Sequence, residues 1–135
     1  MKEFVKWNKK YSLGLKEIDS QHKKLLDFIN EAHELLSMKN NKEEANKLVE
    51  ELISFVRVHF GTEEKYFREF KYDGAGVHIA EHNRITLKVL RVYDKIKKGD
   101  DALLELLTLL REWFDEHCTT YDKDYVKCFK EHGLK

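Results

Sequence analysis

The stretch from His59 to His82 constrains the fold more than any other part of the chain. It holds two pairs of metal-binding side-chain types, His59 with Glu63 and His78 with His82, and the members of each pair are four residues apart. On an α-helix this spacing corresponds to roughly 400° of rotation and about 6 Å of rise, so each pair occupies one face. The segment KYDGAG between the pairs contains two glycines and an aspartate, which favour a turn. We therefore expect two helices that reverse direction and bring their pairs face to face.

Composition favours long helices and a soluble protein without nucleic-acid contacts. The 135 residues include no proline and only six glycines, and proline is the strongest helix breaker. A chain of this length is expected to form a single domain, 1–135, with its own core. The formal net charge is zero, which gives no reason to expect a nucleic-acid partner. No run approaches the ~18 apolar residues of a membrane span, and the N-terminus lacks the apolar segment of a secretory signal.

The two cysteines indicate the redox compartment. Cys118 and Cys128 are ten residues apart, and on one helix they would lie about 15 Å apart, too far for a disulfide. Free thiols are typical of a reducing compartment, so we expect a cytoplasmic protein.

Apolar residues recur at intervals of three and four along most of the chain, which predicts amphipathic helices. The predicted helices span residues 19–38, 42–70, 75–98 and 101–129, and an extended arm spans residues 1–18. Asp19 is the expected N-cap of the first helix, and Trp7, Tyr11 and Leu15 of the arm are expected to pack across helix ends. Short connections place neighbouring helices antiparallel, so the expected fold is all-α, an up-down-up-down four-helix bundle.

Seven candidate metal ligands lie on the apolar faces of these helices. They are His22, His59, Glu63, His78, His82, His117 and Asp122. They fall near the start of the first helix, the end of the second, the start of the third and the end of the fourth. Alternating helix directions bring these four ends to one level. His117 and Asp122 are five residues apart, which on a regular helix would separate them by about 140°. We therefore predict a π-bulge or a break near Thr119 and Thr120.

A structural explanation competes with metal binding for single histidines. A lone interior histidine is more often a satisfied core residue. We interpret His33, which lies about 16 Å from His22 along the first helix, as a core or second-turn residue. His132, in the polar C-terminal tail, is expected to be exposed. Burying five imidazoles and two carboxylates without a metal would instead leave donors and charges unpaired.

The number of ligands bears on the metal. Seven exceed the four of a structural zinc site, and Cys118 would point about 100° away from His117 on a helix. Two metal ions that share the carboxylates would account for all seven candidate ligands. Imidazole suits iron, copper, nickel and zinc, so the ligand chemistry alone leaves the metal open. The Glu-x-x-His spacing of ferritin-like sites does not occur.

Four short motifs carry a resemblance to a known family. They are D-x-Q-H (Asp19 to His22), H-F-x-x-E-E (His59 to Glu64), H-x-x-E-H (His78 to His82) and H-x-x-x-x-D (His117 to Asp122). In this order, and over nearly the full chain, the sequence resembles the hemerythrin family, in particular its single-domain bacterial members. The early Trp7 also fits. A member of that family, myohemerythrin, is an up-down-up-down bundle, so the resemblance implies the same fold.

The resemblance implies a non-haem di-iron centre with an oxo or hydroxo bridge. His78, His82 and His117 would bind one iron and His22 and His59 the other, with Glu63 and Asp122 bridging both. One coordination position would stay open on the iron with two histidines, and the family binds O2 there. Reversible binding needs an apolar surrounding that excludes water. The candidates to line it are Phe60, Phe67, Trp113 and Phe114. Phe114 stands where many bacterial relatives have Leu, and Phe67 where Met is frequent.

Three functions are compatible with such a site. The first is reversible O2 binding for storage or delivery, which is not an enzymatic role, with an O2-consuming enzyme as a candidate partner. The second is a di-iron oxidoreductase acting on peroxide or nitric oxide, although the sequence shows no extra acid or base beside the open position. The third is an O2 or redox sensor, although the chain leaves no room for a signalling module. We expect no membrane partner and favour a monomer.

Overall fold

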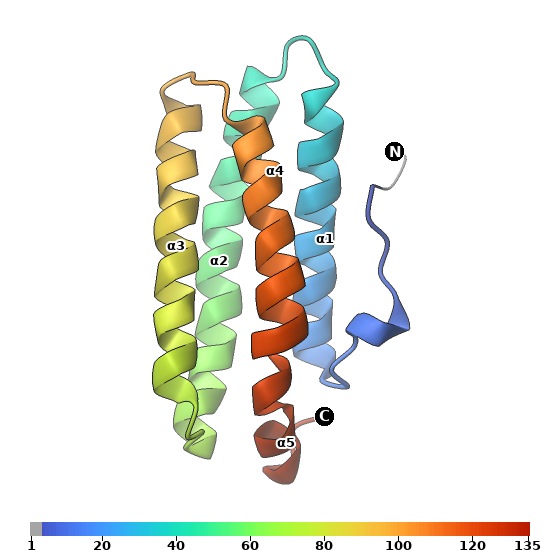
Figure 1. Ribbon diagram of the computed structural model, residues 1–135, viewed down its shortest axis with the longest axis vertical. Coiled ribbons are helices and arrows are strands. Elements are labelled where there is room, and N and C mark those ends of the chain that lie inside the picture. The colour runs from blue at the N-terminus through green and yellow to red at the C-terminus, as the bar shows by residue number, and fades with distance from the viewer. Residues whose placement is uncertain (1–3) are drawn as a thin grey trace.

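Four long helical rods lie side by side and form a bundle (Figure 1). The computed structural model describes residues 4–135. The helices are α1 (Lys16–Leu36), α2 (Lys42–Phe70), α3 (Ala75–Lys97) and α4 (Leu103–Glu112), and the fourth rod continues through the π-helical segment η2 (Trp113–Tyr121) into α5 (Lys123–Glu131). Successive rods run in opposite directions, and each contacts the next around the bundle. The predicted all-α up-down-up-down topology is confirmed, and residues 4–135 contain no strand.

The start of α1 differs from the prediction. The helix begins at Lys16, and Asp19 lies inside its first turn rather than at the N-cap, which is Leu15. The Asp19 carboxylate accepts hydrogen bonds from the Ser12 hydroxyl (2.5 Å) and the Leu13 backbone N–H (2.8 Å). Asp19 therefore ties the end of the arm to the helix. At its other end the helix stops at Leu36, two residues before the predicted boundary.

The middle helices match their predicted ranges closely. The bounds of α2 are those predicted, and α3 ends one residue early, at Lys97. The turn between them does not place a glycine in the left-handed region, where Lys71 lies instead (φ 52°). Gly74 has a different role, because a Cβ there would lie 2.6 Å from the Tyr72 hydroxyl oxygen.

The fourth rod is interrupted, as predicted, but over a longer segment. It begins at Leu103 rather than Asp101 and ends at Glu131 rather than residue 129. The expected single helix is wrong in detail, because nine residues, Trp113–Tyr121, are π-helical. The Asp122 N–H donates to the His117 carbonyl over 2.9 Å. This bond spans five residues and turns both side chains toward the same side of the rod.

The N-terminal arm runs along the outside of the bundle (Figure 1). Residues 1–3 of the predicted arm lie outside the described part, residues 16–18 are helical, and the arm includes a short 3-10 turn, η1 (Lys9–Tyr11). The side chain of Asn30 accepts from the N–H groups of Phe4 (2.7 Å) and Val5 (2.8 Å) and donates to the Val5 carbonyl (2.9 Å). Trp7 and Tyr11 pack against the main core, as expected.

Two apolar clusters fill the bundle. The larger includes Leu25, Leu52, Leu106 and Leu110. The smaller closes the end where the N- and C-terminal segments meet and consists of Leu13, Leu15, Ile18, Phe67, Tyr125 and Phe129. On α1, His22 lies between Ile18 of the smaller cluster and Leu25 of the larger, and on α2, Glu63 lies between Phe60 of the larger and Phe67 of the smaller. Within residues 4–135, no helix combines the length and the apolar character that crossing a bilayer would require.

Candidate metal centre

All seven predicted ligands converge at one level inside the bundle, and all are buried. Their exposed fractions range from 0 to 2% for His22, His59, Glu63, His78, His82, His117 and Asp122. Each helical rod contributes at least one of them, which follows from the start-end-start-end order along antiparallel helices. Burial of so many polar groups in one place is costly unless each has a partner.

Ligand atoms gather in two groups, and within each group they lie within 4.8 Å of one another. The first group is Glu63, His78, His82 and His117, and the second is His22, His59, Glu63 and Asp122. Because Glu63 belongs to both, the groups are adjacent, and the arrangement suits a pair of ions that share a carboxylate.

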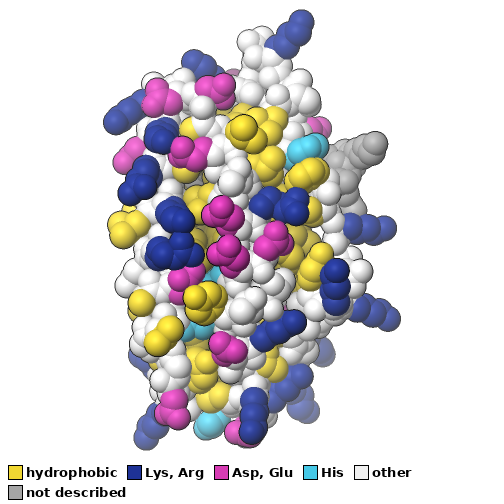
Figure 2. Space-filling view, in the orientation of Figure 1, with side chains coloured by type: hydrophobic (Ala, Val, Ile, Leu, Met, Phe, Trp, Pro, Cys, Tyr) yellow, Lys and Arg dark blue, Asp and Glu magenta, His cyan; other side chains and the backbone are white. Residues whose placement is uncertain are grey.

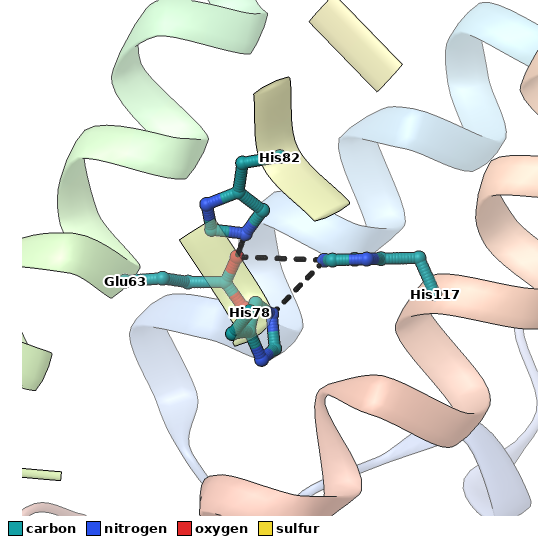
Figure 3. Close-up of side chains that lie close together, drawn as sticks. All are labelled: Glu63, His78, His82 and His117. Atoms are coloured by element: carbon teal, nitrogen blue, oxygen red, sulfur yellow. Dashed lines mark hydrogen bonds and ion pairs between the residues drawn. The ribbon is translucent and has the colours of Figure 1, made fainter. Parts of the chain in front are cut away.

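The first group is drawn in Figure 3, where the three imidazoles and the carboxylate point toward a common centre. His82 Nε2 lies 3.0 Å and His117 Nε2 4.0 Å from Glu63 Oε1. His78 Nε2 and His117 Nε2 are 3.1 Å apart. Nitrogens of imidazoles that aim at one point are the donor set of a transition-metal site.

Asp122 connects the two groups. Its Oδ2 lies 2.9 Å from His22 Nε2, in the second group. Its Oδ1 lies 2.9 Å from His78 Nε2 and 3.0 Å from His117 Nε2, in the first. His59 Nε2 completes the second group at 3.6 Å from Glu63 Oε1. Both carboxylates thus face both groups, as a bridging ligand would.

Several of these atoms lack a hydrogen bond despite being buried. They are Nε2 of His22 and of His59 and both carboxylate oxygens of Asp122. Some of these atoms lie close to one another, but the angles do not suit hydrogen bonds. The nitrogens and oxygens point toward a common space between the side chains instead of toward each other. Unpaired buried polar atoms are rare in proteins, and bound cations would satisfy all four. The residues therefore fit a di-metal centre.

The electrostatics of the cluster differ from residue to residue. Burial lowers the pKa of His59 to about 4, so this imidazole is neutral at pH 7. Burial and Asp122 raise the pKa of Glu63, but attraction to His59 and the contacts with His117 and His82 outweigh them and lower it to about 2. Burial also lowers the pKa of His117, but the Asp122 carboxylate outweighs it and raises the pKa to about 10. The neutral His59 could bind a metal without losing a proton, whereas the protonated His117 would have to release one.

Comparison with known proteins decides the family. Residues 13–129 match the family described as the hemerythrin HHE cation binding domain. The chain belongs to the hemerythrin family.

Its relatives within the family match over most of their length. A bacteriohemerythrin of Aquifex aeolicus is 31% identical over 87% of this chain and 92% of that protein. A bacteriohemerythrin of Clostridium acetobutylicum is 27% identical over 89% of this chain and 97% of that protein. The crystal structure of a wild-type hemerythrin superposes with a TM-score of 0.84 at 25% identity and covers 93% of this chain and 97% of that one.

Three residues contact the predicted ligands from outside the ligand set, and none of the three had a predicted role. Gln21 Oε1 lies 2.6 Å from His59 Nδ1, and Glu64 Oε2 lies 2.8 Å from His82 Nδ1. The hydroxyl of Tyr125 donates to Glu63 Oε2 over 2.5 Å. Burial, followed by the charges of the two carboxylates, raises the pKa of Tyr125 well above its usual range, so the hydroxyl stays a donor.

The sequence did contain signals for these three residues. Gln21 and Glu64 are fixed letters of the D-x-Q-H and H-F-x-x-E-E motifs, directly beside a ligand. Tyr125 follows Asp122 by three residues, which places both on one face of a helix.

Aromatic rings surround the predicted ligands. Three of the four predicted lining residues contact ligand rings: Phe60 stacks on His82 (centroids 3.9 Å apart), Phe67 lies 5.0 Å from His78, and Trp113 lies 6.3 Å from His59. The fourth, Phe114, is buried and packs against Tyr11 of the arm at 4.9 Å. Phe55, which the sequence analysis did not single out, stacks on His59 at 5.6 Å.

The remaining histidines and the cysteines lie apart from the ligand groups. His33 is exposed and stacks on Phe4 of the arm, so its assignment to the core was wrong, although its exclusion from the cluster was right. His132 is exposed, as expected. Cys118 and Cys128 are free thiols.

Proposed function

We propose that this hemerythrin-family chain binds O2 reversibly at a non-haem di-iron centre, for oxygen storage or delivery. The observation that carries the proposal is the pair of buried ligand groups that share Glu63 and leave four polar atoms without partners. The two relatives described above are bacteriohemerythrins, which supports the same assignment.

The residues divide between two iron positions. His78, His82 and His117 would hold one iron, and His22 and His59 the other. The carboxylates of Glu63 and Asp122 would bridge them. When bound, the iron pair supplies the electrons for reversible binding of O2, at the position with fewer histidines.

The protein keeps water away from that position. His59 belongs to the two-histidine group, and the rings of Phe55, Phe60 and Trp113 pack around it. The larger apolar cluster lies on one side of the ligands and the smaller on the other. An apolar enclosure slows the entry of water and protons, which would otherwise promote irreversible oxidation.

The contacts of His59 favour a carrier over an enzyme. Outside the ligand set, the groups in contact with its ring include the amide of Gln21 and three aromatic rings. None of these four groups exchanges protons at neutral pH, and oxidoreductase chemistry on peroxide or nitric oxide requires proton delivery.

The test is a spectroscopic O2 titration of the purified, iron-loaded protein after anaerobic reduction. We expect two iron ions per chain and a coloured oxygenated form that disappears under argon and returns with O2 over repeated cycles. Rapid irreversible oxidation, or turnover of added peroxide or nitric oxide, would replace the carrier assignment with an oxidoreductase. One iron or none per chain would refute the di-iron centre itself.

Iron content of variants tests the ligand assignment. His59→Ala and Asp122→Ala should each lose iron, because each removes a donor from a buried group. His33→Ala is the matched control, since His33 is exposed and lies outside both groups. Full iron content in either ligand variant would contradict the assignment.

A further inference from the structure

Two ligand histidines are held by hydrogen-bond partners of different charge. Nδ1 of His59 faces the amide of Gln21, and Nδ1 of His82 faces the carboxylate of Glu64. His59 and His82 belong to different ligand groups. The two bonds are similar in length, 2.6 and 2.8 Å, so the main difference between them is the charge of the acceptor.

The orientation of the Gln21 amide follows from its second partner. Gln21 Nε2 lies 3.1 Å from the Thr62 hydroxyl oxygen, and that hydroxyl donates its only proton to the Val58 carbonyl over 2.9 Å. Thr62 can therefore only accept from Gln21. The amide NH2 faces Thr62 and the amide oxygen faces His59, which fixes the His59 proton on Nδ1 and leaves Nε2 free toward the ligand group.

Glu64 orients His82 in the same way but adds a negative charge. Its carboxylate accepts from His82 Nδ1, while His82 Nε2 points at Glu63 in the first group. The Glu64 side chain is 29% exposed, so water solvates one side of the carboxylate while the other faces the imidazole. Glu64 is also adjacent in sequence to Glu63, and their side chains leave α2 in different directions to reach opposite nitrogens of one ring.

We propose that Glu64 and Gln21 make the two metal positions electronically unequal, with the stronger electron donation at the His82 position and the weaker at the His59 position. An imidazole whose N–H is bonded to a carboxylate is more basic and a better metal donor than one bonded to a neutral amide. The His82 position therefore favours the higher oxidation state. The His59 position, which has fewer histidines, remains the weaker donor site.

The inference rests on the di-iron centre of the proposed function but not on O2 binding, so its test is carried out without O2. Reduction potentials of the iron-loaded protein are measured by anaerobic spectroelectrochemistry for the wild type, Glu64→Gln, Gln21→Glu and the double exchange. Glu64→Gln keeps the size of the side chain and an acceptor oxygen but removes the charge. Glu69→Gln is the matched control, because it removes the same charge from an exposed position on the same helix.

We expect Glu64→Gln to shift the potential to more positive values and to weaken metal binding by roughly tenfold or more. Gln21→Glu should shift the potential to more negative values, and Glu69→Gln should leave it unchanged. The inference is overturned if Glu64→Gln behaves like Glu69→Gln while retaining two irons per chain. Absence of iron from the wild type would count against the di-iron centre instead, so the two failures are distinguishable.

A second measurement does not depend on iron. In the zinc-loaded protein, proton NMR of the exchangeable imidazole N–H groups should show the His82 Nδ1 proton moving upfield in Glu64→Gln, with the His59 proton unchanged. Gln21→Glu should move only the His59 proton, downfield. Equal responses of both protons to either substitution would contradict a separate influence of each partner on its own histidine.

Discussion

At the scale of single residues, Tyr125 shows how a side chain outside the ligand set supports the site. Its hydroxyl donates to Glu63 Oε2 at 2.5 Å, and both residues are fully buried. The hydroxyl bonds to Oε2 of Glu63, whereas Oε1 faces His82 and His117 (Figure 3). Tyr125 also stacks on Phe129 at 4.2 Å, so it joins the polar cluster to the smaller apolar cluster.

Removal of this hydroxyl should destabilise the protein. In Tyr125→Phe, a buried carboxylate oxygen loses its donor, which costs about 1–3 kcal/mol. Urea unfolding of the metal-free protein measures the loss. Tyr66→Phe is the control, because the Tyr66 hydroxyl donates to the exposed Glu17 over 2.6 Å and its loss should cost less than about 1 kcal/mol. An equal loss in the free energy of unfolding for the two variants would show that the buried hydrogen bond stabilises the protein no more than the exposed one.

His59 makes the stability of the metal-free protein depend on pH. Burial lowers its pKa to about 4, whereas in the unfolded chain it has the ordinary value of about 6.5. Between these values the unfolded chain binds the proton and the folded protein does not. The free energy of unfolding should therefore be highest above pH 6.5, as far as His59 determines it. It should fall by up to about 1.4 kcal/mol per pH unit as the pH decreases toward 4.

Chemical denaturation at several pH values measures this slope. In His59→Gln the slope between pH 6.5 and 4 should be smaller, because the titrating group is gone. An unchanged slope would show that other groups cause the acid destabilisation.

At the scale of elements, η2 differs from the regular helices around it. Its backbone closes a turn over five residues, as the bond from Asp122 N–H to the His117 carbonyl shows. That geometry is rare and tends to occur at functional sites. Ligands lie within and directly after this segment, so bound metal would hold it at two points.

Hydrogen exchange should detect this restraint of η2 by bound metal. In the metal-free protein, amides of residues 118–121 should exchange faster than those of residues 48–56 of α2, which pack in the larger apolar cluster. Metal should slow exchange at 118–121 and leave 48–56 unchanged. Mass spectrometry of peptides measures the exchange rates of the metal-free and the metal-bound protein. Equal rates in η2 with and without metal would show that metal does not restrain this segment.

One side chain of α1, Asn30, holds the start of the N-terminal arm. Asn30 is 8% exposed and satisfies three backbone groups of Phe4 and Val5. In Asn30→Ala the arm should detach at this point, at a cost of about 1–3 kcal/mol, and trypsin should cleave faster at Lys6, Lys9 and Lys10. Asn46→Ala is the control, because the Asn46 amide bonds only to the Lys42 carbonyl of its own helix. Iron content should not change in either variant.

At the scale of the whole molecule, the site joins the four helical rods. Its predicted ligands come from α1, α2, α3 and the end of the fourth rod, and each rod packs on its neighbours through apolar side chains. A metal bound by the folded protein and not by the unfolded chain adds its binding energy to folding.

Metal removal should therefore lower the melting temperature. The iron-loaded protein, measured anaerobically by calorimetry, should melt well above the chelator-treated protein, and added iron should restore the difference. His33→Ala should show the same shift as the wild type, and His59→Ala a much smaller one. Identical melting temperatures with and without metal would show that the site does not contribute to folding.

Features that depend on residues close together in the chain were predictable from the sequence. The bounds of α2 and the α-helical character of the first three rods follow from periodic apolar residues, because that pattern depends only on neighbours three and four positions away. The position of the predicted ligands at one level of the bundle follows from the same periodicity together with the alternating directions of the helices. The five-residue spacing of His117 and Asp122 predicted the interruption, although not that it spans Trp113–Tyr121.

Other features required the packed molecule. Asp19 proved to be an arm tether rather than an N-cap, and Lys71 rather than a glycine took the left-handed conformation. The bond from Tyr125 to Glu63 connects two segments whose rotations about their axes are set by packing.

The sequence by itself thus determined the helices, their order and which seven side chains meet, since these depend on the spacing of residues within each helix. Only the tertiary structure decided which atoms pair across helices, including the amide at His59 and the carboxylate at His82. Such pairs depend on the rotation and height of one helix against another, and these are fixed by contacts between residues far apart in the chain.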